Sequence, residues 1–305
     1  MSYNLKDKLV VAISSRALFE LEDENKIFEE KGLDEYYKYQ MENENTPLEK
    51  GTGYRLVDNL LKINNYFGKD EKQVEVIILS KNNAATSLRI TNAIAHYGLP
   101  IERSGWTSGN DISTYLEAFK VDLFLSANDE DVTHAIENGV AAAKILPTHK
   151  DTTNSLGEQV RIAFDGDAVL FSAESELIYK QYGLEAFMEH EKANKDNPLS
   201  YGPFAKLLHT LSTIQDKFKG KTSPIRTALV TARGAPTHER VIKTLNVWGV
   251  RIDEAFFLGG SEKYEVLKAF GADIFFDDQD CHLDLSSSVV PSAKVIHKSI
   301  ESFKK

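Results

Sequence analysis

Residues 162–171 read Ile-Ala-Phe-Asp-Gly-Asp-Ala-Val-Leu-Phe, an apolar run interrupted by two carboxylates one residue apart, Asp165 and Asp167. A buried strand that ends here would place both carboxylates at the carboxyl edge of a parallel sheet, where open α/β folds bind their ligands. There, one carboxylate can attack phosphorus and both can hold a divalent cation. Asp-Gly is also a common turn dipeptide, so this stretch alone leaves a plain strand-to-loop turn as an equal alternative.

Short apolar segments alternate with longer amphipathic ones along the whole chain, which predicts strands alternating with helices. The expected strands cover residues 9–13, 74–79, 122–125, 160–164, 225–230 and 273–276. Residues 84–97 and 237–248 have helical spacing, and each segment is followed by a glycine suited to a helix C-terminus, Gly98 and Gly249. The pattern predicts an α/β fold of parallel sheets with helices on both faces.

The two halves of the chain match each other at a constant offset of 151 residues. Matched pairs include Gly32-Leu33 with Gly183-Leu184, Pro47-Leu48 with Pro198-Leu199, Arg89 with Arg240, Gly98 with Gly249, and Asp122 with Asp273. This predicts a tandem duplication of one domain. The alternative is that two unrelated α/β halves share only a generic spacing of strands and helices.

The same offset shows where the halves differ. It places Ser14 on Asp165, Arg16 on Asp167, Ser80 on Thr231, Ile112 on Lys263, Ser126 on Asp277 and Ala127 on Asp278. The first half therefore lacks every charge of the candidate site, and a hydroxyl alone cannot hold a metal or form an acyl-phosphate. We expect the second half to be the catalyst and the first half to be a non-catalytic copy.

The other polar residues at the ends of second-half strands form one constellation with the paired acids. Thr231 ends one strand, Lys263 follows a Gly-Gly loop, and Asp277 and Asp278 end a further strand. Carboxylates from two strand ends suit Mg²⁺, which prefers oxygen ligands and bridges to substrate phosphates. Thr231 can donate to a phosphoryl oxygen, and Lys263 offsets repulsion between a carboxylate and a phosphate dianion. Together these residues indicate phosphoryl transfer.

The order Asp-x-Asp, Thr, Lys, Asp-Asp resembles the haloacid dehalogenase-like phosphatase superfamily. The chain more closely resembles the cytosolic 5′-nucleotidase type I family, in residues 12–19, 161–171, 227–233 and 255–260. The resemblance implies a duplicated Rossmann-like fold with Mg²⁺ as cofactor and a nucleoside 5′-monophosphate as substrate, AMP being the leading candidate. It implies these roles: Asp165 as nucleophile, Asp167 as general acid and base, Thr231 as phosphate ligand, Lys263 as positioning cation, and Asp277 and Asp278 as further metal-site acids.

The segment Ser172–Ser223 matches the position of a cap inserted over the active site in that superfamily. The predicted domains are then residues 1–150, with a cap-like insert at about 20–70, and residues 151–305, with the cap at about 172–223. The expected substrate-binding residues are Phe187, His190, Tyr201 and Phe204 of the cap, with Thr231, Ala232, Arg233 and Lys263. Any one of the aromatic rings could instead belong to the core of the cap, and Arg233 could hold a phosphate or anchor the cap.

Composition narrows the classes of protein. The 305 residues include 42% hydrophobic and 27% charged residues and carry a formal net charge of −10, which argues against a nucleic-acid binder. No apolar run is long enough to cross a membrane, and the single cysteine, Cys281, fits a reducing compartment. We therefore expect a cytoplasmic protein with no membrane partner, and the sequence leaves a homo-oligomer open. Two alternatives to a nucleotidase remain: a phosphatase of sugar phosphates and a nucleotide-sensing regulatory protein.

Overall fold

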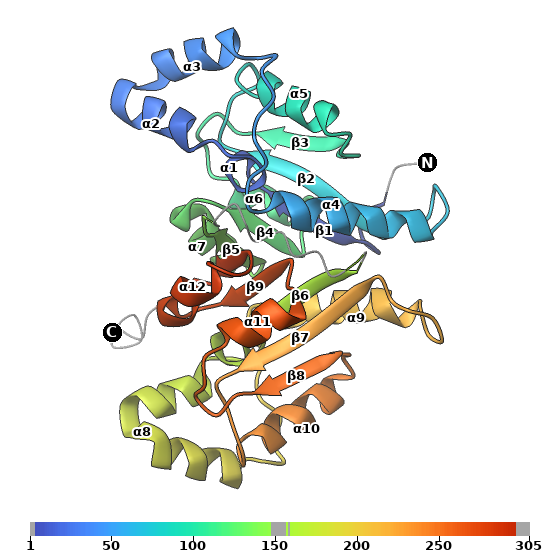
Figure 1. Cartoon of the computed structure of the whole chain (residues 1–305), viewed down its shortest axis with the longest axis vertical. Coiled ribbons are helices and arrows are strands. Elements are labelled where there is room, and N and C mark those ends of the chain that lie inside the picture. Colours follow the sequence, from blue (N-terminus) through green and yellow to red (C-terminus); the bar gives the residue numbers. More distant parts are fainter. Residues whose placement is uncertain (1–3, 148–156, 158, 297–305) are drawn as a thin grey trace. The chain divides into compact units, whose positions relative to one another are not determined.

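The structure is a computed structural model that describes residues 4–147, 157 and 159–296. It divides into two compact units, Met1–Val140 and Ala141–Lys305, called unit 1 and unit 2 below (Figure 1). The domain boundary expected between residues 150 and 151 lies outside the described residues.

Unit 1 contains a parallel sheet in the strand order β3-β2-β1-β4. Its strands are β1 (Leu9–Ile13), β2 (Val74–Ser80), β3 (Arg103–Trp106) and β4 (Leu123–Ser126). Its helices are α1 (Ser15–Leu18), α2 (Glu22–Lys31), α3 (Leu33–Glu42), α4 (Tyr54–Lys62), the 3-10 turn η1 (Ile63–Tyr66), α5 (Leu88–His96), α6 (Ser113–Leu116) and α7 (Asp129–Glu137). Every residue of β1, β2 and β4 is buried, as expected for a sheet covered on both faces.

Unit 2 contains six strands in the order β5-β10-β9-β6-β7-β8. The strands are β5 (Ala141–Ile145), β6 (Val160–Phe164), β7 (Ile225–Thr231), β8 (Glu254–Phe257), β9 (Ile274–Asp277) and β10 (Ser292–Lys294). The helical elements are η2 (Gly166–Leu170), α8 (Glu174–Ala193), α9 (Ala205–Asp216), α10 (His238–Trp248), α11 (Tyr264–Phe270) and α12 (Asp280–Ser286). Pairing is parallel except between β5 and β10, which are antiparallel. The predicted mixed α/β fold with a mostly parallel sheet is confirmed.

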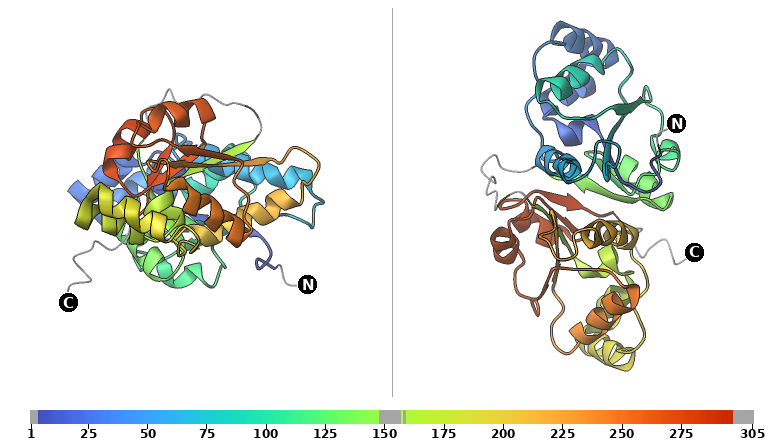
Figure 2. Two further views of the ribbon diagram at one scale, coloured as in Figure 1. Left: turned by 90° about the horizontal axis from the view of Figure 1, so that it is seen from below. Right: turned by 90° about the vertical axis from the view of Figure 1, so that its right-hand side faces the viewer.

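Side chains alternate between the two faces of the unit 2 sheet, and each face has its own core. On one face, Phe164 stacks on Phe276 with ring centroids 5.7 Å apart, and Phe204 packs on Phe276 at 4.7 Å. On the other face, Ala163 and Phe275 belong to a cluster with residues of α11 and α12. Helices α9 and α10 therefore lie on one side of this sheet and α11 and α12 on the other, as Figure 2 shows.

Equivalent strands of the two units pair in the same register. Leu9 lies opposite Val74 as Val160 lies opposite Ile225, and each pair is related by the offset of 151. Strand-edge contacts repeat as well. Asp122 accepts a hydrogen bond from the Val10 amide at 3.0 Å, and Asp273 accepts one from the Arg161 amide at 2.8 Å.

The turns after β1 and β6 depart from this correspondence by one residue. In α1 the Phe19 amide donates to the Ser15 carbonyl, four residues back. In η2 the Phe171 amide donates to the Gly166 carbonyl, five residues back. Unit 2 therefore holds one extra residue in the turn that follows its candidate catalytic strand.

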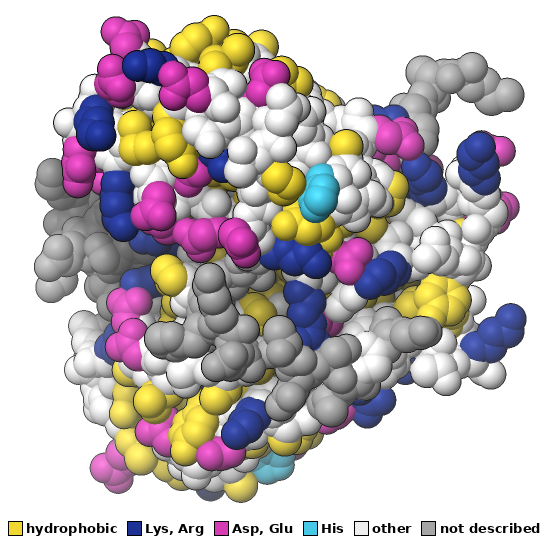
Figure 3. Space-filling model, turned by 45° about the horizontal axis from the view of Figure 1, so that its top comes forward, with side chains coloured by type: hydrophobic (Ala, Val, Ile, Leu, Met, Phe, Trp, Pro, Cys, Tyr) yellow, Lys and Arg dark blue, Asp and Glu magenta, His cyan; other side chains and the backbone are white. Residues whose placement is uncertain are grey.

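The strands expected from the sequence are confirmed, with ends that differ by at most one residue. Helix α10 ends at Gly249 in a left-handed conformation, as its glycine signal predicted, whereas α5 is shorter than the predicted residues 84–97. Among the described residues, no helix has the length and apolar character needed to span a membrane. On the face drawn in Figure 3, the described basic side chains are interspersed with acidic ones.

Candidate active site

Three carboxylates meet at the carboxyl edge of the unit 2 sheet. Asp165 directly follows β6, while Asp277 is the last residue of β9 and Asp278 follows it. One carboxylate oxygen from each lies within 4.8 Å of the others. Because β6 and β9 are adjacent and parallel, their ends bring together residues more than a hundred positions apart in the sequence. Asp167, the fourth predicted acid, is not part of this cluster.

Lys263 lies between two of these acids. Its Nζ is 2.7 Å from Oδ1 of Asp165 and 2.7 Å from Oδ2 of Asp277, and the lysine is only 2% exposed. Burial alone would lower the pKa of Lys263, but Asp165 and Asp277 outweigh it and raise that pKa above the ordinary value. The ammonium therefore stays charged and links Asp165 at the end of β6 with Asp277 at the end of β9.

The pKa values of the two acids that Lys263 bridges shift in opposite directions. Burial, together with the nearby charges of Asp277 and Asp278, raises the pKa of Asp165 well above its ordinary value despite Lys263. Burial also acts to raise the pKa of Asp277, but Lys263 and His282, whose Nδ1 is 3.2 Å away, hold it below the ordinary value. A cation bound beside Asp165 would supply the positive charge that favours its ionised form.

The turn η2 aims the acids that follow β6. Gly166 separates them, and a Cβ added there would lie 3.3 Å from Oγ1 of Thr231, so glycine permits the close approach of β6 and β7. Ala168 has φ 59°, a left-handed conformation that costs a non-glycine residue about 1–2 kcal/mol. Thr231, 2% exposed, accepts a hydrogen bond from the Arg233 amide at 3.3 Å.

Asp167 belongs to a second cluster, built around Arg233. Nε and Nη2 of Arg233 donate to the two carboxylate oxygens of Asp167, each at 2.7 Å, and Nη1 donates to Glu191 of α8. Glu191 is 1% exposed and also accepts from Arg240 at 2.8 Å and from Ser175 at 2.7 Å. Of the two roles left open for Arg233, the structure gives it direct contact with α8.

The predicted aromatic residues are not gathered in one place. Phe187 lies on α8 with the Arg233 guanidinium over its ring at 5.2 Å, and His190 contacts Glu191 at 3.2 Å. Tyr201 is 69% exposed and packs on Trp248 of α10, 4.5 Å between centroids.

Phe204 has no exposed surface and packs against both Phe164 and Phe276, so its ring is part of the sheet core and has no face free for a base. Ala232 is exposed in the loop after β7, where its carbonyl accepts from the Gly260 amide at 2.9 Å.

Sequence reasoning missed Glu191 and His282. Glu191 is one of several acids on a charged helix, and its burial depends on Arg233 and Arg240, which are distant in the sequence. His282 follows Asp277 by five residues, a spacing that places it at the first turn of α12 facing the strand end. The retained arginine pair, Arg89 and Arg240, was the available signal for a buried acid partner.

The donor set of the three-acid cluster fits a hard divalent cation. Asp165, Asp277 and Asp278 offer carboxylate oxygens in reach of one another, and these are the ligands that Mg²⁺ takes. Fold and site together define the class: an α/β protein with a carboxylate site for a divalent cation at the carboxyl edge of its parallel sheet.

Comparison with known proteins identifies the family within that class. The family model described as 5′-nucleotidase matches residues 1–302. The chain is 39% identical over 288 residues to human cytosolic 5′-nucleotidase 1B, a match covering 92% of this chain and 47% of that protein. The chain thus spans about half the length of this curated relative. The chain belongs to the 5′-nucleotidase family, as its sequence motifs predicted.

Proposed function

We propose that this chain hydrolyses nucleoside 5′-monophosphates to nucleoside and phosphate, with AMP as the leading substrate and Mg²⁺ as the cation. The observation that carries the proposal is the buried cluster of Asp165, Lys263 and Asp277 with Asp278 beside it, in a chain of the 5′-nucleotidase family. The name of the human relative supports the same activity and a cytosolic location, each of which we extend to this chain as part of the proposal.

The first chemical step is assigned to Asp165. One of its oxygens attacks phosphorus, the bond from phosphorus to the ribose 5′-oxygen breaks, and an aspartyl-phosphate forms. Asp165, Asp277 and Asp278 would hold the cation, which when bound neutralises phosphate charge and keeps Asp165 ionised. Lys263 holds Asp165 at the end of β6, and the Thr231 hydroxyl is assigned as a donor to a phosphoryl oxygen.

Asp167 is assigned the proton transfers. It protonates the departing 5′-oxygen and then takes a proton from the water that hydrolyses the aspartyl-phosphate. Both of its oxygens accept hydrogen bonds from Arg233, so the transferred proton must use a lone pair that Arg233 does not occupy. Arg233 also binds Glu191 on α8, so a movement of α8 would change the contact between Arg233 and Asp167 and with it the proton transfer assigned to Asp167.

Helix α8 is proposed as the cap over the site, with Phe187 and His190 as its substrate-facing residues. The support is the buried anchor that joins Glu191 of α8 to Arg233 and Arg240. The two units are further proposed to be tandem copies of one domain. The equal strand registers and the repeated aspartate contacts at the strand edges support this origin.

A substrate panel tests the proposal. Phosphate release would be measured from AMP, CMP, IMP and glucose 6-phosphate with Mg²⁺ and again with EDTA. We expect the nucleotides, AMP first, to be hydrolysed faster than the sugar phosphate and EDTA to stop release. Equal rates on glucose 6-phosphate and AMP would contradict nucleotide specificity, and full activity in EDTA would contradict the cation.

A further inference from the structure

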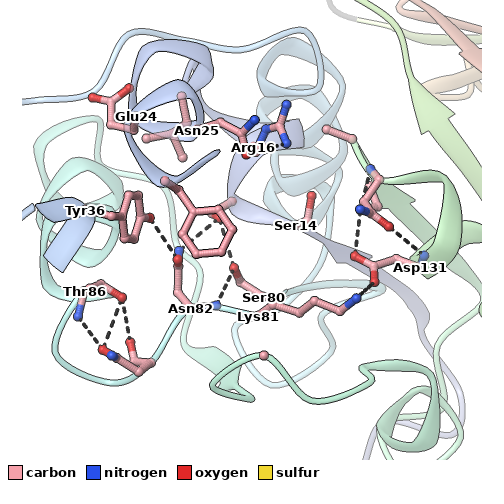
Figure 4. Close-up of a pocket in the computed structure, with 18 of the residues that line it drawn as sticks. Ser14, Arg16, Glu24, Asn25, Tyr36, Ser80, Lys81, Asn82, Thr86 and Asp131 are labelled. Carbon is pink, nitrogen blue, oxygen red and sulfur yellow. Dashed lines mark hydrogen bonds and ion pairs between the residues drawn. The ribbon is translucent and has the colours of Figure 1, made fainter. Parts of the chain in front are cut away.

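Unit 1 contains a cavity of about 460 Å³ at the carboxyl ends of β1, β2 and β4 (Figure 4). This volume lies within the usual range for small-molecule sites, roughly 300–1,000 Å³. In Figure 4, Arg16 and Asn25 lie along one side and Ser80, Lys81 and Asn82 along the other, with Ser14 between them. Helices α2 and α3 contribute one wall through Phe28, Leu33 and Tyr36, and residues 126–128 with Asp131 line the side next to β4.

The cavity occupies the place in unit 1 that the acid cluster occupies in unit 2. Ser14 follows β1 and its amide donates to Leu125 at 2.8 Å, just as the Asp165 amide donates to Phe276 at 2.8 Å. Hydroxyls at Ser14 and Ser126 and a guanidinium at Arg16 replace carboxylates at the equivalent positions. The strand-end carboxylates that would repel a phosphate in the absence of a metal are therefore replaced at these positions, and the two acids that still line the cavity are each paired with a cation, Asp131 with Lys81 and Glu24 with Arg89.

Ser14 supplies an unused polar group. It is 7% exposed and lines the cavity, and its Oγ has no hydrogen-bond partner among the described residues. A buried hydroxyl without a partner costs about 1–3 kcal/mol, which a ligand oxygen accepting its proton would recover. Beside it, Ser15 and Ser80 share a hydrogen bond at 3.0 Å, and Asn82 donates to Ser15 at 3.3 Å.

Two cations are held at the same end of the cavity. Arg16 is fixed by Glu22, through bonds of 2.8 and 3.0 Å, and by Asn25 at 2.9 Å. Lys81 is fixed by Asp131 at 2.7 Å. Their side chains remain 31% and 33% exposed, so each is positioned by a partner and still accessible to an anion.

The opposite end of the cavity is apolar and aromatic. Phe28 and Tyr36 pack edge to face with centroids 5.9 Å apart, and Phe28 is 47% exposed. The Tyr36 hydroxyl donates to Asn82 at 2.9 Å, which connects this wall to the polar end. Exposed aromatic rings of this kind are surfaces on which planar rings pack.

We propose that this cavity is a second ligand site, which binds a phosphate-bearing molecule with a planar ring, such as a nucleotide, without a metal and without hydrolysing it. The phosphate lies at Ser14, Arg16 and Lys81, and the ring lies against Phe28 and Tyr36. Hydrolysis does not occur there because a serine hydroxyl needs an adjacent base to attack phosphorus, and Ser14 Oγ has no hydrogen-bond partner among the described residues. The proposal does not depend on the activity of unit 2.

Binding would be measured on the full chain carrying Asp165→Asn, in EDTA, so that neither turnover nor a metal contributes. The probes are AMP, inorganic phosphate and adenosine, and the affinity of each is measured by isothermal titration calorimetry. We expect AMP to bind at least tenfold more tightly than either phosphate or adenosine. Equal affinity of adenosine and AMP would overturn the phosphate contact, equal affinity of phosphate and AMP would overturn the ring contact, and no binding of AMP at millimolar concentration would overturn the site.

Variants of unit 1 locate the binding. Ser14→Asp restores a carboxylate at the phosphate end, and Arg16→Gln removes a partly exposed cation. Each should weaken AMP binding about tenfold or more, the loss expected for one charge-assisted hydrogen bond. Lys62→Gln, on α4 outside the cavity lining, is the matched loss of a positive charge and should leave affinity unchanged. Affinity unchanged in both cavity variants, with either folded as judged by circular dichroism, would overturn the proposal.

Discussion

The ends of β1 and β6 hold opposite chemistry on the same backbone plan. Both strands lie at the centre of a parallel sheet, pair in the same register and end in an amide that bonds to the neighbouring strand. At β6 the next residue is Asp165, bound to Lys263; at β1 it is Ser14, facing a cavity. The comparison teaches that the sheet determines the position of a binding site, whereas a few side chains at the strand ends determine the chemistry that is possible there.

Each unit has a buried arginine at the equivalent position, Arg89 in unit 1 and Arg240 in unit 2. One contact of this arginine is the same in both units and supports the fold, whereas its acidic partner differs between them. Arg89 donates to the Thr46 carbonyl and Arg240 to the Asn197 carbonyl, positions related by the offset of 151. Their acidic partners differ: Arg89 binds Glu24, and Arg240 binds Glu191. Glu191 alone of these acids extends the contact to Arg233 and so reaches the candidate general acid.

The largest effect is expected from removing the proposed nucleophile of unit 2, Asp165. Asp165→Asn keeps the shape of the side chain but cannot form an acyl-phosphate, so turnover of AMP should fall by roughly 10³-fold or more. Phosphate release with Mg²⁺ is the measurement, and circular dichroism checks the fold. Asp284→Asn, an exposed acid of α12, is the control and should keep wild-type activity. Wild-type turnover in Asp165→Asn would refute the assignment.

The second test replaces the buried Lys263 of unit 2 with isoleucine, the residue that unit 1 has at the equivalent position, Ile112. Lys263→Ile leaves Asp165 and Asp277 buried without their shared cation, which should lower the free energy of unfolding by about 3–5 kcal/mol in EDTA. Urea denaturation measures this change. Added Mg²⁺ should restore more stability to the variant than to the wild type, because it supplies charge beside the same acids. A loss below about 1 kcal/mol would show that the acids do not need Lys263.

A smaller loss of unfolding free energy is expected at Glu191, where unit 1 has an amide side chain at the equivalent position. The residue of unit 1 equivalent to Glu191 by the offset of 151 is Gln40, whose Oε1 accepts from Arg89 at 3.3 Å. Glu191→Gln therefore gives unit 2 the same amide and leaves Arg233 and Arg240 with a neutral partner, at an expected cost of about 2–3 kcal/mol in unfolding free energy. KM for AMP should also rise, since α8 loses its anchor. Glu189→Gln, an exposed acid on the same helix, is the control. If the two variants unfold at the same urea concentration, the anchor is not a stabilising contact.

The smallest expected effect is the change of the unfolding free energy at acidic pH, through the ionisation of Glu191. Burial acts to raise the pKa of Glu191, but Arg233, the Ser175 hydroxyl and Arg240 outweigh it and hold the pKa below 4.5. Stability from this ionisation is therefore present above about pH 4.5 and lost as the pH falls through the lowered pKa. The difference in unfolding free energy between wild type and Glu191→Gln should narrow between pH 6 and pH 3.5. A difference that widens in acid would mean the pKa is raised.

The parts of the fold that could be predicted are those buried on both faces. Strand β1 is a continuous apolar run, and β2, β6 and β7 are mostly apolar with one charged residue each, a pattern that the sequence displays directly. Strands β3 and β8 lie at sheet edges with half-exposed residues, so they lack that signal. Strand β5 is rich in alanine, which favours helix when taken alone, and β10 has three residues.

The acid cluster could be predicted because its members sit at strand ends, where chain order translates into position. Asp165, Lys263, Asp277 and Asp278 do lie together. The contacts of Arg233 could not be predicted, since they depend on how α8 packs. Of the two places left open for the Phe204 ring, its burial fits the core, and aromatic composition alone does not tell which face of a segment is buried.

The one-residue difference between α1 and η2 decides whether substitutions alone could give unit 1 the side-chain arrangement of unit 2. Substituting acids and a lysine at Ser14, Arg16, Ile112, Ser126 and Ala127 would restore the side chains on a turn that is still one residue short. The strained Ala168 conformation and the longer turn would be missing, so the second acid would follow a regular helix instead. The two turns therefore differ in length as well as in side chains, although the offset of 151 holds on both sides of them, for Leu9 with Val160 and for Val74 with Ile225.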